Sequence, residues 1–210
     1  MVTYSTPIAA RRDPNETRTR ILEALGRIIV RDGLAAVGVN PLAREAGADK
    51  VLIYRYFGDL DGVYAAFAEQ GDFWWSAADL TAGLDPAATP LKDAIKTCLR
   101  RHAEEIRRRP VTLAVLAAEP AERTPLVIAL ESVRERRALE LVAWLGARYA
   151  ARADLDLEAI TMILSSALNY LAARSRKIRL MSGVPIQTDE DWRRLLAAVD
   201  QIIDGLFAVA

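Results

Sequence analysis

The sequence predicts an all-α protein of about nine helices. Runs of alternating apolar and polar residues are nearly absent from its 210 residues, and so are the Asn-Gly pairs that form hairpin turns. Ala, Leu, Arg and Glu dominate instead, and apolar residues recur at intervals of three and four, which is helical spacing. We therefore expect helices throughout the chain.

Capping residues and glycines place four helices in the first 75 residues. Asn15 is a favourable N-cap for the first helix, and Gly33 ends it. Pro41 is tolerated in the first turn of a short second helix. Asp49 is a favourable N-cap for a third helix, which Gly58 ends. We predict these helices at about residues 15–33, 40–46, 50–57 and 59–74.

A linker-like segment, Leu80–Pro90, separates these helices from five more. Prolines end two of the five, and Asp156 and Asp189 or Asp191 are favourable N-caps for the last two. We predict the five helices at about residues 91–109, 111–118, 125–152, 156–181 and 189–207.

Composition excludes several kinds of site. Lys and Arg number 28 and Asp and Glu also number 28, so the chain has no overall basic field, and polyanion binding requires a local patch. Cys98 and His102 are the single residues of their types, which is too few for a Cys/His zinc site. We expect no cofactor, and Cys98 is expected to be a small buried apolar side chain. No apolar run reaches 18 residues and the N-terminus lacks a signal-peptide core, so we expect a cytoplasmic protein without a membrane partner.

The predicted helix at residues 50–57 has two chemically different faces. Helical spacing gathers its apolar residues on one side, and these are Leu52, Ile53, Tyr56 and Phe57. The other side carries Lys50, Val51, Tyr54 and Arg55. Cations and a phenol can bind phosphate oxygens or base edges, and Val51 can meet a thymine methyl group. A short helix, a glycine turn and a second short helix is the helix-turn-helix arrangement, although a solvated helix face has the same composition.

The segment from Thr17 to Phe67 resembles the N-terminal domain of the TetR family of bacterial transcriptional regulators. The resemblance rests on ILEA in the first helix, the DG pair at Asp32-Gly33, LAREAG, and the aromatic run IYRYF. It implies an all-α homodimer in which a three-helix helix-turn-helix head binds operator DNA. It also implies a larger C-terminal domain that binds a small effector and dimerises. We expect a flexible arm at 1–14, the head at 15–60 and the effector and dimerisation domain at 61–210.

Three positions depart from the family pattern. Gly38 stands where the family usually has Ser or Thr, Asp49 where it often has Ser, and Leu60 where it usually has Lys. We expect Asn40 to substitute for the missing hydroxyl of Gly38. Residues 1–60 carry a net charge of only +2, from nine basic and seven acidic residues. DNA binding is therefore expected to depend on Arg11 and Arg12 as an arm for phosphates or the minor groove, together with Asn40 and the outward face of residues 50–57.

The larger domain offers candidates for an effector pocket and for a dimer interface. We expect the pocket to involve Phe67, Trp74, Trp75, Cys98, His102, Trp144 and Tyr170. For His102 a hydrogen-bonded position in the core is the alternative, and one of Trp74 and Trp75 is expected to be buried. Apolar stripes on the last two helices predict a four-helix bundle between two subunits, although an intramolecular core would show the same stripes. The stripes comprise Ile160, Ile163, Leu164, Ala167, Leu171, Trp192, Leu195, Val199, Ile202 and Leu206.

The resulting hypothesis is a dimeric DNA-binding repressor that a small, largely apolar effector releases from its operator. A regulator-like helical ligand-binding protein with weakened DNA binding is the alternative, and Gly38, Asp49 and Leu60 favour it. An enzyme finds little support, because the sequence has no phosphate-binding loop and a single histidine.

Overall fold

The computed structural model describes residues 13–70, 73–121, 123–150 and 152–208. The chain divides into two compact units, which we call the head (Met1–Val63) and the body (Tyr64–Ala210). The expected arm at 1–14, including Arg11 and Arg12, lies almost entirely outside the described residues. In the described part of the chain, no helix is long and apolar enough to cross a membrane.

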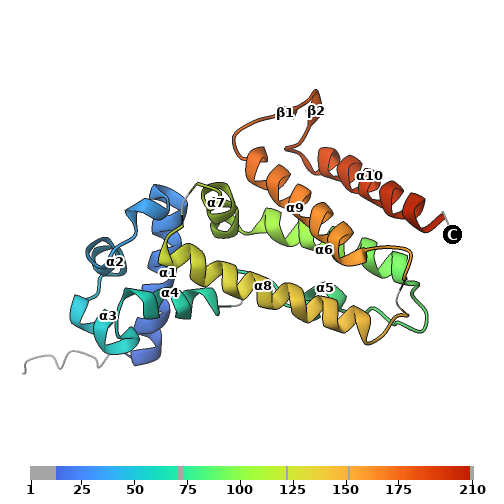
Figure 1. Cartoon of the computed structure of the whole chain (residues 1–210). Coiled ribbons are helices and arrows are strands. Elements are labelled where there is room, and N and C mark those ends of the chain that lie inside the picture. The colour runs from blue at the N-terminus through green and yellow to red at the C-terminus, as the bar shows by residue number, and fades with distance from the viewer. Residues whose placement is uncertain (1–12, 71–72, 122, 151, 209–210) are drawn as a thin grey trace, which may run out of the picture. The chain divides into compact units, whose positions relative to one another are not determined.

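The head contains three α-helices and a short 3-10 turn (Figure 1). Their bounds are Pro14–Asp32 for α1, Leu34–Ala36 for η1, Val39–Ala46 for α2 and Lys50–Phe57 for α3. α2 packs against both α1 and α3. The apolar sides of the helices meet in a core that includes Ile21, Leu25, Leu42 and Ile53, all of which are fully buried. Burial of such side chains is the main force that holds these short helices together.

Within the described residues, the body contains seven helices and one hairpin of two short strands. α4 is counted here, although its first residues belong to the head. The bounds are Leu60–Ala68 (α4), Ala77–Thr81 (α5), Leu91–Arg108 (α6), Pro110–Ala118 (α7), Pro125–Gly146 (α8), Leu157–Ser175 (α9) and Asp189–Ala208 (α10), with strands Leu180–Met181 (β1) and Val184–Pro185 (β2). α6 is the central helix, because it packs against α5, α7, α9 and α10. The fold is all-α, as the sequence predicts, with one helix more than expected in the described part of the chain.

The additional helix arises because the predicted helix at 59–74 is interrupted. α4 ends at Ala68, and the carbonyl of Phe73 accepts a hydrogen bond from the buried Thr112 hydroxyl at 2.5 Å. Ser76 then begins α5 through a capping box with Asp79, in which each side chain accepts from the other residue's backbone N–H. The Phe73 carbonyl and the Ser76 N–H are thus bonded to side chains and not to the backbone of a continuing helix.

Two other predicted helices are longer than the observed ones. α8 ends at Gly146, not at about residue 152, and α9 ends at Ser175, not at about residue 181. β1 and β2 follow α9 as an antiparallel pair, in which Leu180 lies opposite Pro185. Ser182 and Gly183 form the turn with φ of 49° and 80°. The left-handed backbone at these two positions cannot continue a helix.

Candidate nucleic-acid interface and effector cavity

The turn between α2 and α3 is built from a left-handed glycine and a capping aspartate. Gly47 has φ 56° and ψ 39°, a conformation that glycine adopts without steric cost. The Asp49 side chain accepts a hydrogen bond from the backbone N–H of Val51 at 2.9 Å and so begins α3. Gly58 ends α3, where its N–H donates to the carbonyl of Tyr54 at 2.8 Å. α2, the turn and α3 therefore form a helix-turn-helix.

Arg18 of α1 fixes the far end of α3. Its Nη1 donates to the carbonyl of Tyr56 at 2.5 Å, and its guanidinium carbon lies 4.6 Å from the centre of the Phe57 ring. A cation at the last carbonyls of a helix also interacts favourably with the helix dipole. The inner face of α3 is completed by Ile53, which is fully buried. α3 is thus held to α1 at one end and packed on the core at its centre.

The outer face of α3 carries the residues that the sequence predicts for DNA contact. Lys50, Val51, Tyr54 and Arg55 are all exposed, with 67% of Val51 and 51% of Tyr54 accessible. Among the described residues neither Lys50 nor Arg55 has an ion-pair partner. Asn40 of α2 is also exposed, and its side chain makes no hydrogen bond with another described residue. These groups are free to bind an external anion.

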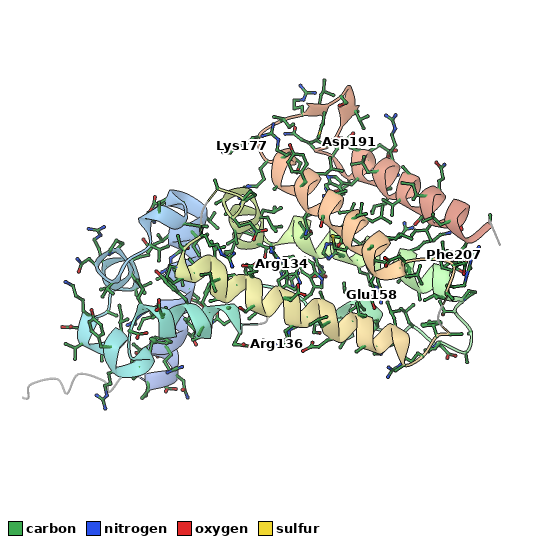
Figure 2. The ribbon with its side chains drawn as sticks, in the orientation of Figure 1. Arg134, Arg136, Glu158, Lys177, Asp191 and Phe207 are labelled. Atoms are coloured by element: carbon green, nitrogen blue, oxygen red, sulfur yellow. The ribbon has the colours of Figure 1, made fainter. Side chains whose placement is uncertain are left out.

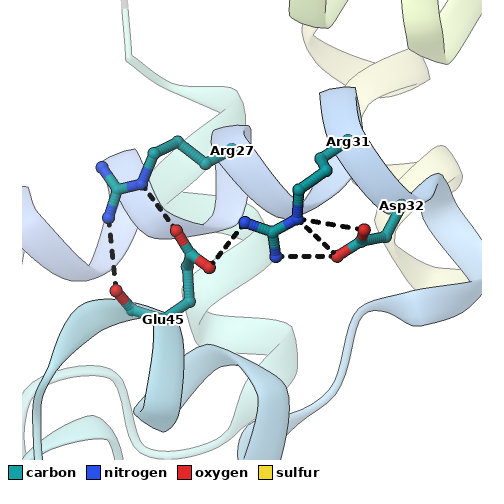
Figure 3. A network of polar contacts seen from close by, with 4 residues as sticks. All are labelled: Arg27, Arg31, Asp32 and Glu45. Carbon is teal, nitrogen blue, oxygen red and sulfur yellow. Dashed lines mark hydrogen bonds and ion pairs between the residues drawn. The ribbon is translucent and has the colours of Figure 1, made fainter.

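A network of two arginines and two carboxylates links α1 to α2 (Figure 3). Glu45 accepts from Arg27 Nε at 2.8 Å and from Arg31 Nη1 at 2.9 Å, and Arg31 also pairs with Asp32 at 2.8 Å. The hydrogen bonds from Arg27 and Arg31 lower the pKa of the Glu45 carboxyl. The sequence analysis did not predict this network. Two arginines of the head, Arg27 and Arg31, are therefore paired with carboxylates of the head itself.

The structure shows what the three unusual positions do locally. Gly38 precedes α2 with an extended backbone and provides no side-chain cap, and Asn40 does not replace it as a cap. A Cβ added at Gly38 would meet the Pro41 side chain at 3.6 Å, which is ordinary contact. Leu60 is the first residue of α4 and is half-buried. The surroundings of Gly38 therefore leave room for a side chain, so steric crowding does not require glycine at this position.

The body encloses a cavity of about 470 Å³, a volume typical of small-molecule sites. Five residues predicted for a pocket lie in its wall, namely Trp74, Trp75, Cys98, His102 and Tyr170. Phe67 and Trp144 do not. Phe67 is buried against the Phe73 ring, with 6.5 Å between ring centres, and Trp144 packs under the Arg148 guanidinium at 4.6 Å.

An aromatic cluster forms the deep wall of the cavity. The rings of Trp74 and Trp75 are stacked with centres 4.1 Å apart, and the His102 ring meets Trp75 edge-on at 4.8 Å. Both tryptophans are buried and both line the cavity, which agrees with the prediction of one buried ring and one that is exposed or lines a cavity. His102 Nε2 lies 2.9 Å from Asn169 Oδ1.

The deep wall is also uncharged near neutral pH. Burial lowers the pKa of His102 to about 4, although its hydrogen bonds to Asn169 and to the backbone of Ser165 act in the opposite direction. Burial raises the pKa of the Cys98 thiol to about 11. The imidazole is therefore neutral and the thiol protonated, so apolar and neutral polar groups are favoured beside them.

Charged residues also line the cavity, and they are not among the pocket residues predicted from the sequence. Nη1 of Arg134 donates to both carboxylate oxygens of Glu119 at 2.7 Å, and Arg137 pairs with Glu140 at 3.1 Å. Glu135 of α8 and Glu158 of α9 line the same cavity (Figure 2 labels Arg134 and Glu158). Only knowledge of which helices pack together could have found them, because the end of α7, α8 and α9 each contribute charged residues that lie far apart in the sequence.

The residues predicted for a dimer interface differ in exposure. Ile163 of α9 and Ile202 of α10 are exposed at 60% and 49%. Ala167 is also exposed, and half-buried residues on the same two helices are Ile160, Leu164, Leu171, Leu195, Val199 and Leu206. Trp192 does not belong to such a surface. It is only 1% exposed, because its indole N–H donates to the carbonyl of Ile186 at 2.9 Å and its ring packs under Arg107.

Comparison with known proteins agrees with the geometry of the head. Residues 21–67 match the model of the tetR family of bacterial regulatory proteins. A segment of 61 residues, 29% of this chain, is 39% identical to the HTH-type transcriptional repressor SCO4008 of Streptomyces coelicolor. The matched segment spans 32% of the length of SCO4008, so the similarity covers only about a third of that repressor.

Solved structures extend the similarity in fold to nearly the whole chain. The fatty acid degradation regulator FadR from Bacillus halodurans has a TM-score of 0.63 at 17% identity, over 92% of this chain and 96% of its own. The TetR-family regulator SCO4454 from Streptomyces coelicolor has a TM-score of 0.62 at 22% identity, over 93% and 92% of the two chains. At these identities the comparisons show the fold alone. The helix-turn-helix segment of the chain, residues 21–67, therefore matches the tetR family of bacterial regulatory proteins, and nearly the whole chain shares the fold of the compared regulators.

Proposed function

We propose that this chain is a sequence-specific DNA-binding repressor, which acts in the cytoplasm as a homodimer and is released by a small, largely apolar effector. The outer face of α3 carries the proposal, because Lys50, Tyr54 and Arg55 are exposed there on the second helix of a helix-turn-helix. The Lys and Arg side chains would bind phosphates or base edges in the major groove, and the Tyr54 hydroxyl would donate to a phosphate. Arg11, Arg12 and Asn40 are proposed as additional phosphate contacts.

The exposed apolar residues of α9 and α10 support dimerisation. Ile163 and Ile202 are exposed on two helices that both pack against α6, and pairing with a second copy would bury them. A twofold dimer presents two recognition helices to successive major grooves, about 34 Å apart.

Release from DNA would follow a shift between two conformations. An effector in the cavity favours the conformation in which the two heads are wrongly spaced, and it does so only by its difference in affinity for the two states. The boundary between the two compact units falls within α4, between Val63 and Tyr64. We propose that α4 transmits the change.

A second candidate function is a helical ligand-binding protein with weakened DNA binding. Gly38 lacks a hydroxyl for a phosphate, Asp49 places an acid at the start of α3, and Leu60 lacks a cation. Each change removes attraction to DNA or adds repulsion.

Fluorescence anisotropy with labelled DNA from upstream of the gene separates the two functions. A repressor should prefer this DNA over a scrambled duplex and lose affinity steeply with salt. Tyr54→Ala/Arg55→Ala should weaken binding and reduce the salt slope, because phosphate contacts are lost. Arg123→Ala is the matched control, since it removes an exposed cation that pairs with Glu131 in the body. Equal weak binding to both duplexes would favour the second function.

A further inference from the structure

The cavity offers hydrogen-bond donors that have no protein partner. Asn169 Oδ1 is bonded to His102, but the Asn169 amide Nδ2 makes no hydrogen bond with a described residue. The Nε of Arg137 is buried without a partner, and the hydroxyl of Tyr170 has none among the described residues. All three side chains line the cavity. Unpartnered donors in a wall favour a ligand that brings acceptors.

Two hydroxyls and one carboxylate of the same wall are bonded within the protein. The Thr161 hydroxyl donates to the Leu157 carbonyl at 2.7 Å, and the Ser165 hydroxyl donates to the Met162 carbonyl at 3.0 Å. Both carboxylate oxygens of Glu119 accept from Arg134. Thr161, Ser165 and Glu119 are therefore already engaged, and Glu135 and Glu158 are the lining carboxylates that remain without a bond to another described residue.

The charges around the cavity do not favour an anion. Arg134 and Arg137 are each paired with a carboxylate. Glu135 and Glu158 also line the cavity and have no cationic partner within the described residues. The lining thus carries three carboxylates (Glu119 among them) and two guanidiniums, a formal charge of −1. A carboxylate ligand would add a further negative charge beside them.

His102 connects the aromatic wall to the free amide. Its ring lies 4.8 Å from the Trp75 ring centre, and its Nε2 lies 2.9 Å from Asn169. His102 therefore lies between Trp75 and Asn169, and a ligand ring in contact with the two indoles would be separated from the Asn169 side chain by the width of the imidazole. Contacts between aromatic rings stabilise beyond the burial of their area, so this wall favours an aromatic ligand over an aliphatic one of equal size.

We propose that the cavity binds an uncharged aromatic carbonyl compound, with its ring against Trp74 and Trp75 and its carbonyl oxygen accepting from Asn169. This inference rests on the effector cavity of the proposed function and specifies the chemical class of the ligand. Arg137 and Tyr170 are the additional donors available to a second acceptor on the same compound.

Three naphthalenes of similar shape test the proposal by equilibrium dialysis against the full chain without DNA. 2-Acetylnaphthalene carries a neutral acceptor, 2-naphthoate carries an anion, and 2-ethylnaphthalene carries no acceptor. We expect the ketone to bind roughly three- to tenfold more tightly than the hydrocarbon, the usual effect of one hydrogen bond, and more tightly than the carboxylate. Tightest binding of 2-naphthoate, equal binding of ketone and hydrocarbon, or binding of none would overturn the proposal.

Variants of the donor locate the effect. Asn169→Leu and Asn169→Asp should both remove the ketone's advantage over the hydrocarbon, and the aspartate retains an acceptor for His102. Ser175→Ala is the matched control, because that hydroxyl lies on the same helix outside the cavity lining and is bonded to the helix backbone. An advantage that persists in a folded Asn169 variant would contradict the assignment of the donor. The three ligands on the unmodified chain decide the ligand class even where a variant does not fold.

The outcome is independent of operator binding. All affinities are measured without DNA, so a chain that binds no operator can still show the expected order of ligands. Conversely, intact operator binding together with the wrong order of ligands overturns only the ligand class.

Discussion

Nε2 of His102 on α6 lies 2.9 Å from Oδ1 of Asn169 on α9, and this bond joins two helices of the body across 67 residues of sequence. The two side chains lie within hydrogen-bond distance, and the imidazole is neutral near pH 7. The pair is a structural element as well as part of the cavity wall, and the burial of His102 makes the stability of the body depend on pH.

Stability should fall between pH 6.5 and 4 because of His102. Its pKa is about 4 in the folded chain and about 6.5 when unfolded, so the unfolded chain binds more protons in this window. The contribution is complete above pH 6.5 and is lost as the pH falls, by on the order of 3 kcal/mol at most. Urea unfolding at several pH values should show a steeper decline for the native chain than for His102→Gln. Parallel curves would contradict this assignment.

Gly38→Ser should strengthen DNA binding. The added side chain meets only ordinary contact at Pro41 and an extended backbone that any residue adopts, so it causes no strain. The hydroxyl can cap α2, which stabilises by a few tenths of a kcal/mol relative to glycine, and can bond a phosphate. Anisotropy titrations should show several-fold higher affinity for Ser but not for Gly38→Ala. A gain shared by both variants would show that the hydroxyl is not responsible.

Thr112→Val should destabilise the body. The buried Thr112 hydroxyl bonds the Phe73 carbonyl, and its loss leaves that carbonyl without this partner at a cost of about 1–3 kcal/mol. Thr97→Val is a suitable control, because the Thr97 hydroxyl donates to the Asp93 carbonyl within a helix. Chemical denaturation should therefore show a large decrease for Thr112→Val and a small one for Thr97→Val, and similar decreases would argue against a role for the bond in ending α4.

Ile163→Asp should prevent dimerisation if α9 lies at the interface. The side chain is exposed in the single chain, so folding should tolerate the change, whereas a carboxylate buried between two subunits would be unpaired. Sedimentation equilibrium should give the mass of a monomer for this variant and of a dimer for the native chain. Leu139→Asp on α8, where the exposure is similar, should remain dimeric. A dimeric Ile163→Asp would place the interface elsewhere.

The sequence by itself determined α2, α3, the end of α1 and the two faces of α3, whereas the N-cap of α1 is Asp13 and not the predicted Asn15. Asp49 and Gly58 begin and end α3 where their side-chain chemistry predicts, and spacing separates the buried Ile53 from the exposed Tyr54. These features depend on groups within four residues of each other, whose geometry a helix fixes. The same locality explains why Asp156 correctly predicts the start of α9.

Only the tertiary structure decided where helices are interrupted and which residues line the cavity. α4 ends early while Phe73 is bonded to Thr112, 39 residues away, and Trp144 lies outside the cavity while Asn169 lies within it. An apolar stripe in sequence has the same appearance whether it faces a core, a cavity or a second subunit, as the buried Trp192 and the exposed Ile202 show. The surroundings of such residues depend on which helices pack together, and that is a property of the whole chain.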